Sequence, residues 1–233
     1  MKEKYVSFRL DKLSLAGADN QYQHDYRITS PSYIDKSRSK DNKTIYMSDD
    51  LRGVESLKTY NEGQRARVKE KTGRTAQKSA EFFNQGIMTF SHDMAEDYER
   101  NPSLFAECSE SFIKRVQEEL GLQVMYANLH LDEYTPHIHL MFDNIDKTSG
   151  KGIRRKINPK NLSKAQDLLG EAFEPMGYER GRPVEETGAK HLSVNLLHKL
   201  GAVAEELNDE IFSLETLIKL KESNNPDLDF LLK

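Results

Sequence analysis

The sequence has a single cysteine and no long apolar segment. Cys108 has no partner for an intrachain disulfide, which excludes a disulfide framework and is typical of a protein from a reducing cytoplasm. Its helix-like surroundings, LFAECSESF, indicate a structural thiol. No run of about 18 apolar residues is present, and the N-terminal MKEKYVSFRLDK lacks the apolar core of a signal peptide. We therefore expect no membrane segment and a cytoplasmic location.

Net charge is also small, at −4, but it is unevenly distributed. Residues 201–233 contain eight acidic side chains and three lysines, so the first 200 residues carry a net charge of +1. Within these, residues 147–164 have seven basic side chains and no acidic one, and residues 64–78 have six against Glu70. Local basic blocks of this kind are typical of segments that bind a polyanion, although each could also be a solvated loop.

Periodicity predicts an α+β fold: an antiparallel sheet with helices on one side. Residues 29–45 have the composition of a loop. A weakly apolar helix is expected within residues 48–80. Strands are expected at residues 4–10, 81–90, 122–132 and 137–144. Helices are expected from near Ala18 or Asn20, and at residues 93–100, 104–120 and 159–176.

The pattern changes from Ser193 onward. Apolar residues recur there at intervals of three and four over about three heptads, which predicts a C-terminal helical arm at residues 193–233 after a folded domain at residues 1–192. The arm could form a homodimer or pack on its own chain. The apolar seam consists of Leu196, Leu200, Val203, Leu207, Ile211, Leu214 and Ile218.

Three of the seven histidines fall within ten residues, at His130, His137 and His139. His137 and His139 are two apart on a predicted strand and therefore share a face. The short link through Pro136 predicts a hairpin that brings His130 across to them. Three converging imidazoles predict an open metal site, which suits Mn, Zn, Co, Ni or Cu. The carboxylates of Asp132 and Glu133 could orient a ligand or hold a water.

A second polar group, His24-Asp25-Tyr26-Arg27, follows the first predicted strand. His24 and Arg27 are three residues apart and would share one face of a helix. Such a pair is weak evidence alone, but this helix could lie over the sheet face that carries the three histidines. A metal site by itself leaves the reaction open, and a hydrolase of another ester is an alternative.

The motifs together resemble the MobV (Pre/Mob) relaxases, a family of histidine-hydrophobe-histidine endonucleases. Residues 130–139 match the pattern H-x-D-E-x-x-P-H-x-H, and His24 with Arg27 matches H-x-x-R. The resemblance covers roughly residues 4–190, including the loop around Ser37-Arg38-Ser39 and the segment 177–181. One departure stands at Asn42-Lys43-Thr44-Ile45, where the family has Asn-Tyr-Glu-Leu.

This resemblance implies a relaxase-like sandwich and site- and strand-specific nicking and joining of single-stranded or supercoiled plasmid DNA at a transfer origin. His130, His137 and His139 would hold a divalent ion, Mn²⁺ in the first place and Mg²⁺ or another ion as alternatives. His24 would attack the phosphorus, with Arg27 and Glu133 in the catalytic group. DNA contacts are assigned to Arg38, Asn42, Lys43, Lys151, Arg154, Arg155 and Lys156.

Three alternatives stay open on the sequence alone. The nucleophile could be one of the nearby tyrosines, Tyr22, Tyr26, Tyr33 or Tyr46, as in other relaxases. The enzyme could be a rolling-circle replication initiator on the same scaffold. The chain could also be a non-catalytic DNA-binding regulator, which would keep the basic loops but show no metal-dependent nicking.

Overall fold

The computed structural model describes residues 4–54, 56–78, 80, 82–91, 94–133 and 135–182, with the isolated positions 186, 207 and 211; for Arg154 it describes the backbone alone. The chain divides into two units, Met1–Gly181 and Arg182–Lys233, and the sheet and its helices lie in the first. The predicted arm at residues 193–233 lies outside the described residues, apart from the exposed helical positions Leu207 and Ile211.

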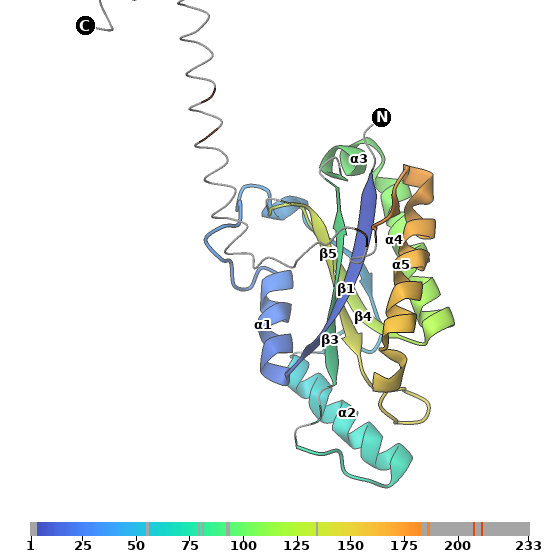
Figure 1. Ribbon diagram of the computed structural model, residues 1–233. Helices are drawn as coiled ribbons and strands as arrows, with labels where there is room; N and C mark the ends of the chain where they lie inside the picture. The colour runs from blue at the N-terminus through green and yellow to red at the C-terminus, as the bar shows by residue number, and fades with distance from the viewer. Residues whose placement is uncertain are drawn as a thin grey trace, which may run out of the picture. The chain divides into compact units, whose positions relative to one another are not determined.

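A six-stranded sheet with the order β2-β4-β5-β3-β1-β6 forms the middle of the domain (Figure 1). Its four inner strands confirm the prediction, and all pairs among them are antiparallel. These strands are β1 (Tyr5–Leu13), β3 (Phe83–Phe90), β4 (Gln123–His130) and β5 (His137–Asp143).

Two short edge strands complete the sheet. β2 (Lys43–Met47) pairs antiparallel with β4, and β6 (Glu179–Arg180) pairs parallel with β1. The expectation of a loop throughout residues 29–45 is therefore wrong for the start of β2. An edge strand with no buried residue lacks the alternation of buried and exposed positions by which strands are recognised, and this explains the error.

Helices α1 (Leu15–Asp25), α2 (Leu57–Thr72), α3 (Met94–Arg100), α4 (Pro102–Leu120) and α5 (Pro159–Phe173) surround the sheet. The first of them begins earlier than expected, because the Ser14 side chain accepts a hydrogen bond from the Gly17 N–H and caps it. Short 3-10 turns occur at Ser39–Asp41, Arg154–Lys156 and Glu174–Met176. No helix in the described part of the chain has the length and apolar character that a membrane crossing requires.

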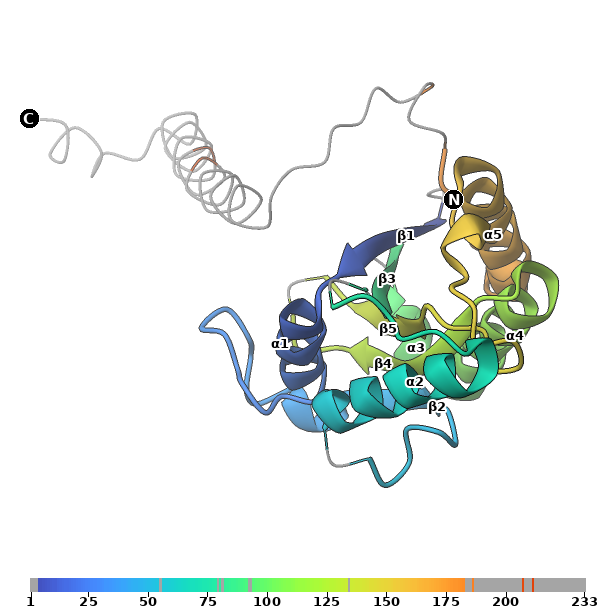
Figure 2. The same ribbon diagram turned by 90° about the horizontal axis from the view of Figure 1, so that it is seen from below.

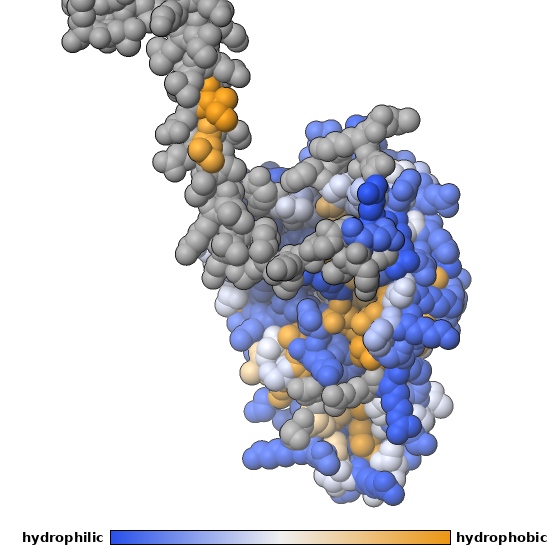
Figure 3. All heavy atoms as spheres, viewed as in Figure 1, coloured by the Kyte–Doolittle hydropathy of each residue, from blue (hydrophilic) through white to orange (hydrophobic). Residues whose placement is uncertain are grey.

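The helices pack on both faces of the sheet, not on one as expected (Figure 2). α4 and α5 bury one large core, to which Phe8, Phe112 and Phe142 contribute edge-to-face ring contacts. A smaller core lies under α1 and α2 and includes Leu57 and Tyr126. β4 and β5 are buried almost throughout because both their faces are covered. Seen from the side of Figure 1, hydrophilic residues dominate the described surface (Figure 3).

Cys108 lies in the larger core as a free, buried thiol. Burial, followed by the charge of Glu107, raises its pKa above the ordinary value, so little thiolate forms at neutral pH. These properties fit the structural thiol that its sequence context indicates.

Gly86, in the middle of β3, allows the two phenylalanines of neighbouring strands to approach the backbone. A Cβ atom at this position would stand 2.7 Å from a Phe142 ring carbon and 2.8 Å from a Phe8 ring carbon. We expect Gly86→Ala to lower the free energy of unfolding by about 1–3 kcal/mol, since the packed rings must shift. Urea denaturation measures this change.

Gly63→Ala is the matched control for Gly86→Ala. This α2 glycine has open space around the position of a Cβ atom, so the substitution should raise the free energy of unfolding, by up to about 1 kcal/mol, through helix propensity alone. Equal unfolding midpoints for Gly86→Ala and the wild type would contradict the packing argument.

Candidate metal centre

The three clustered histidines meet at one end of the β4–β5 hairpin. His130 is directly opposite His137 in the antiparallel register, and His139 is opposite Asn128, so all three side chains project from one sheet face. The ring centroids lie 5.3 Å apart for His130 and His137, 5.0 Å for His130 and His139, and 4.6 Å for His137 and His139. The hairpin that the sequence predicts thus brings the imidazoles together in a buried cluster.

Each imidazole has one nitrogen bound to a neighbouring group. His130 Nε2–H donates to the Asp25 carbonyl oxygen at 3.1 Å, and His137 Nδ1–H donates to the Thr135 carbonyl oxygen at 2.8 Å. The Gln85 side-chain amide meets His139 Nδ1 at 3.1 Å, and an amide can present either its oxygen or its nitrogen there. These partners fix the ring orientations, as the outer neighbours of metal-bound histidines do.

The remaining nitrogens point toward one another. His137 Nε2 and His139 Nε2 are 2.9 Å apart, and the buried His130 Nδ1 has no hydrogen-bond partner. The nearest carboxylate oxygen is Glu133 Oε1, at 3.4 Å from His130 Nδ1 and 3.8 Å from His137 Nε2. Three inward-facing nitrogen donors with one carboxylate oxygen fit a divalent cation with ligand positions left over.

Burial also suits the cluster to bind a cation through neutral rings. It lowers the pKa of His137, although the charge of Glu133 opposes this, and it lowers the pKa of His139 well below the ordinary value, with help from the neighbouring imidazoles. For Glu133, burial opposes ionisation, but the neighbouring imidazoles of His130, His24 and His137 outweigh it and hold its pKa far below the usual range. The centre therefore combines two imidazoles of lowered pKa, His137 and His139, with one carboxylate.

His24 lies at the edge of this cluster, on the last turn of α1. Its ring centroid is 5.3 Å from that of His130 and 5.5 Å from that of His139, and its Nε2 is 3.1 Å from Glu133 Oε1. The interpretation that the first helix lies over the histidine face therefore agrees with the structure. His24 has a partly exposed side chain, with 16% accessible, so it can reach a substrate.

Arg27 reaches the same group by a route that the sequence did not indicate. α1 ends at Asp25, and Arg27 has a left-handed backbone with φ of 54°, so the two residues do not share a helix face as expected. The turn nevertheless places the Arg27 guanidinium 3.2 Å from His24 Nε2 and lets it donate to the His24 carbonyl at 2.8 Å.

The guanidinium of Arg27 is paired with two carboxylates. It donates to both oxygens of Asp132, at 2.9 and 2.5 Å, and to Glu133 Oε1 at 2.9 Å. Ser39 Oγ also donates to Asp132, at 2.6 Å. Asp132 thus anchors the loop that follows α1 to the β4–β5 hairpin. The N–H donors of the Arg27 guanidinium, which could bind a phosphate, are directed at these two carboxylates.

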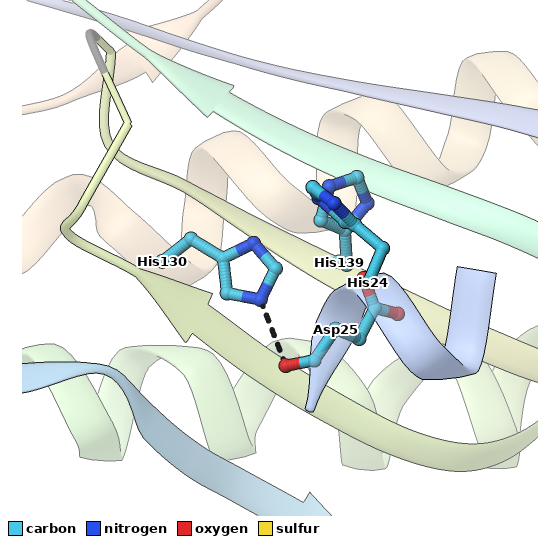
Figure 4. A group of neighbouring side chains, drawn as sticks. All are labelled: His24, Asp25, His130 and His139. Carbon is cyan, nitrogen blue, oxygen red and sulfur yellow. Dashed lines mark hydrogen bonds between the residues drawn. The ribbon is translucent and has the colours of Figure 1, made fainter. Parts of the chain in front are cut away.

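Asp25 is a site residue that sequence reasoning left without a role. It is buried beside His24 in the group drawn in Figure 4, where its backbone carbonyl holds His130. Among the residues that the structure describes, two groups could hold a cation: His24, Asp25, His130 and His139, or His130, Glu133 and His137.

The Asp25 carboxylate is the weaker of the acidic candidates for a cation. Its two oxygens already accept hydrogen bonds from Gln21 and Tyr126. Burial raises its pKa to about 6, against the opposing charge of His130. We therefore favour Glu133 over Asp25 as the carboxylate of the centre. In the sequence, Asp25 is marked only by its position as an acidic residue directly after the histidine of the H-x-x-R motif.

The predicted DNA-binding residues fall into two separate places. Arg38, Asn42 and Lys43 lie at the histidine end of the sheet, where Asn42 Oδ1 accepts from the Leu131 N–H at 2.8 Å. Lys43 is exposed at the start of β2. Lys43 is in register with Leu129, which packs into the larger core, so the Lys43 side chain projects from the sheet face opposite the histidines.

The other four predicted residues, Lys151, Arg154, Arg155 and Lys156, belong to the basic loop that follows β5. A strand of seven residues is about 20 Å long, so this loop lies about that far from His137. Lys151 and Arg155 are exposed, whereas Lys156 donates to the Gly121 carbonyl at 3.2 Å. The side chain of Arg154 lies outside the described part of the chain. The loop also approaches α2, since a Cβ atom on Gly150 would stand 2.6 Å from that of Lys71.

The described domain is an α+β sheet whose clustered histidines could hold a divalent ion, with a fourth histidine, His24, at their edge. A family model described as plasmid recombination enzyme, Mob_Pre, matches residues 2–199. The chain therefore belongs to the Mob_Pre family, and the resemblance drawn from its motifs is confirmed.

Curated relatives carry the same description. A plasmid recombination enzyme from a Bacillus species is 28% identical over 221 residues, covering 92% of this chain and 49% of the relative. A type 2 plasmid recombination enzyme from Staphylococcus aureus strain Mu50 is 28% identical, covering 93% of this chain and 50% of the relative. The chain thus spans about half the length of these relatives.

Solved structures of the MobM relaxase domain share the fold. One, Mn-bound and in complex with a 22-nucleotide pMV158 oriT DNA, is 26% identical, covers 84% of this chain and 99% of that domain, and has a TM-score of 0.66. A second Mn-bound complex, with a 3′-thiophosphate on the DNA, has a TM-score of 0.65 at the same identity. The expected α+β class is confirmed by this likeness.

Proposed function

We propose that this chain is a metal-dependent DNA relaxase that nicks and rejoins one strand at a plasmid transfer origin. The observation that carries the proposal is the cluster of three oriented imidazoles with His24 and Arg27 held at its edge. Mn²⁺ is the first candidate ion, in keeping with the ion bound in the MobM structures. A bound divalent ion would polarise the scissile phosphate and stabilise charge on its oxygens.

His24 is the proposed nucleophile. One of its ring nitrogens attacks the phosphorus, the bond from phosphorus to the 3′ oxygen breaks, and that oxygen leaves as a 3′-OH after taking a proton. The 5′ phosphate remains on His24 as a phosphoramidate, which conserves bond energy for rejoining. Glu133 accepts from His24 Nε2–H and so orients the ring with Nδ1 as the attacking atom. Arg27 positions both groups through the hydrogen bonds that it donates to the His24 carbonyl oxygen and to Glu133.

The tyrosines that compete with His24 are poorly placed for attack. The Tyr26 hydroxyl is buried without a hydrogen-bond partner, and burial raises the pKa of Tyr26 to about 12. The Tyr22 ring packs against the smaller core, in contact with the rings of Tyr26 and Tyr126. Tyr46 packs against the larger core, which leaves Tyr33 as the exposed alternative. Burial and the charge of Glu133 raise the pKa of Tyr33, which opposes its ionisation.

The decisive experiment is formation of a covalent adduct. The full chain is incubated with Mn²⁺ and labelled single strands tiled across the DNA that flanks its gene, and denaturing gels are searched for a shifted band. One strand of one sequence should react. A replication initiator would instead react with strands from a replication origin, and a DNA-binding regulator would retard strands without forming an adduct.

Binding of the DNA strand is proposed to involve Arg38, Asn42 and Lys43 near the centre, and Lys151, Arg154, Arg155 and Lys156 at the far loop. We expect Lys151→Ala/Arg155→Ala to weaken binding of the reactive single strand and to reduce the slope of log affinity against log salt by about 0.7 for each phosphate that is no longer neutralised. Adduct formation at saturating DNA should persist, since this loop is distant from the imidazoles. Fluorescence anisotropy across a salt series measures the slope.

The double variant Lys114→Ala/Lys164→Ala is the control for the basic loop. It removes the same charge from α4 and α5, where both lysines pair with glutamates. Its salt slope should equal that of the wild type. If the loop variant also keeps the wild-type slope, the loop faces solvent and is not part of the DNA site.

Two further parts of the proposal rest on sequence. Residues 193–233 could join two copies of the chain through the apolar seam. Sedimentation would test this by comparing the molecular mass in solution of the full chain with that of a chain ending at residue 192. A cytoplasmic location accords with the single buried thiol.

A further inference from the structure

The sheet face that carries the histidines is covered over some strands and open over others. β5 is buried along its whole length. In β3, Phe83 at the start of the strand is buried on this face too, but Gln85, Ile87 and Thr89, nearer the metal centre, are only partly buried, while Met88 and Phe90 on the opposite face are buried. The metal centre therefore lies at the boundary between the covered and the open part of this face, and a strand of DNA can approach it across β3 and β1.

Arg9 lies in the same row of the sheet as one of the clustered histidines. His139 is in register with Ile87 on β3, and Ile87 is in register with Arg9 on β1. Two strand spacings put the Cα atoms of His139 and Arg9 about 10 Å apart. Val6 and Phe8 pack into the core under α4 and α5, so the alternating side chain of Arg9 projects from the histidine face, and it is exposed.

On this face, Arg9 has the only basic side chain among the described residues of β1 and β3. Ser7 is paired with Thr89 through their hydroxyls at 2.7 Å. Asp11 lies one row further from the hairpin end, opposite Gln85. A guanidinium on a rigid strand, beside a centre that cleaves a phosphodiester, has the charge and fork geometry to hold a phosphate.

We propose that Arg9 binds a backbone phosphate of the substrate strand close to the scissile phosphate, and so sets the direction in which the strand crosses β3 and β1. This inference rests on the proposed relaxase function. Arg9 acts here as a positioning residue for the strand and has no part in holding the cation, which is two strands away.

The first test compares Arg9→Ala with Lys12→Ala. Lys12 is exposed on the same strand but projects from the opposite face, so the control removes an equal charge from the same element. The probe is the single strand that forms the adduct, or an oligothymidylate if none does. Arg9→Ala should bind about tenfold more weakly and show a salt slope smaller by about 0.7, and Lys12→Ala should match the wild type.

The second test locates the phosphate. A series of reactive strands, each with one neutral methylphosphonate linkage, should contain one member that weakens binding to the wild type about as much as Arg9→Ala does. The same modified strand should bind Arg9→Ala as tightly as the unmodified strand does. Arg9→Lys should keep the salt slope but recover only part of the affinity, because an ammonium lacks the bidentate fork.

Calorimetric titration with Mn²⁺ in the absence of DNA should give the same affinity for Arg9→Ala and the wild type, which shows that the centre is intact. The inference is overturned if Arg9→Ala binds the strand like the wild type, if Lys12→Ala weakens binding as much, or if no single linkage couples to Arg9. Failure of the relaxase proposal is distinct, since the wild type would then form no adduct with any tiled strand.

Discussion

We expect alanine in place of His137 or His139 to abolish nicking while binding of the DNA strand largely survives. Both rings point their Nε2 atoms into the cluster, 2.9 Å from each other, so either change removes one of three inward nitrogen donors. Loss of the bound ion removes several kcal/mol of charge stabilisation in the transition state, and about 4 kcal/mol corresponds to a thousandfold lower rate. Phosphate-binding residues elsewhere are untouched, so the affinity for DNA changes little.

Three measurements check this expectation. Adduct formation with Mn²⁺ should fall to background, calorimetric titration with Mn²⁺ should show no high-affinity site, and fluorescence anisotropy should report nearly unchanged DNA binding. Urea denaturation of the metal-free proteins should still show a cooperative transition for both variants, at a somewhat lower urea concentration than for the wild type, because each substitution removes the hydrogen bonds of a buried imidazole.

Gln85→Ala is a graded control for the histidine variants. Its amide holds His139 from outside the cluster, and loss of such a partner lowers metal affinity by about 10- to 100-fold without removing a ligand. Nicking by Gln85→Ala should therefore recover at high Mn²⁺, whereas nicking by His139→Ala should not. Undiminished cleavage by both histidine variants would disprove the metal assignment.

The hairpin that carries the histidines could be predicted because its geometry is local. His137 and His139 alternate on one strand, and a short link through Pro136 leaves few registers in which His130 could fail to meet them. β-strand alternation and hairpin closure depend on neighbouring residues alone. The four inner strands were predictable for the same reason.

Features that depend on distant packing could not be predicted. The helices cover both faces, which buries β4 and β5 almost throughout, but the short apolar runs in these strands do not say how many layers cover them. Arg27 meets His24 through a left-handed turn, stabilised by Asp132 more than a hundred residues away, whereas the sequence suggested a continuous helix. The row from His139 through Ile87 to Arg9 becomes visible only with the pairing of β1, β3 and β5.

His24→Ala is expected to remove the covalent adduct, and Tyr26→Phe to retain it. His24 is partly exposed beside the imidazole cluster, whereas the Tyr26 hydroxyl is buried and its pKa is raised to about 12. A neutral imidazole attacks at pH 7 without losing a proton first, while a tyrosine of that pKa would be almost wholly protonated. Adduct yield on denaturing gels should therefore fall to background in His24→Ala alone.

The chemistry of the bond separates the two nucleophiles independently of any substitution. A nitrogen–phosphorus bond to histidine breaks in mild acid and survives alkali, whereas a tyrosine phosphodiester survives mild acid. The wild-type adduct should therefore disappear on brief acid treatment and persist in base. Tyr33→Phe belongs in the same series, because Tyr33 is the exposed tyrosine near Glu133.

Loss of the adduct in His24→Ala would also follow if the ring only supported the metal centre. Mn²⁺ titration distinguishes these roles, since a nucleophile variant should keep metal affinity, while a variant that lacks a ligand should lose it. His24 belongs to one of the two groups that could hold a cation, so this measurement decides between them. An acid-stable adduct that forms in His24→Ala and is lost in Tyr26→Phe or Tyr33→Phe would make tyrosine the nucleophile and leave His24 a supporting residue.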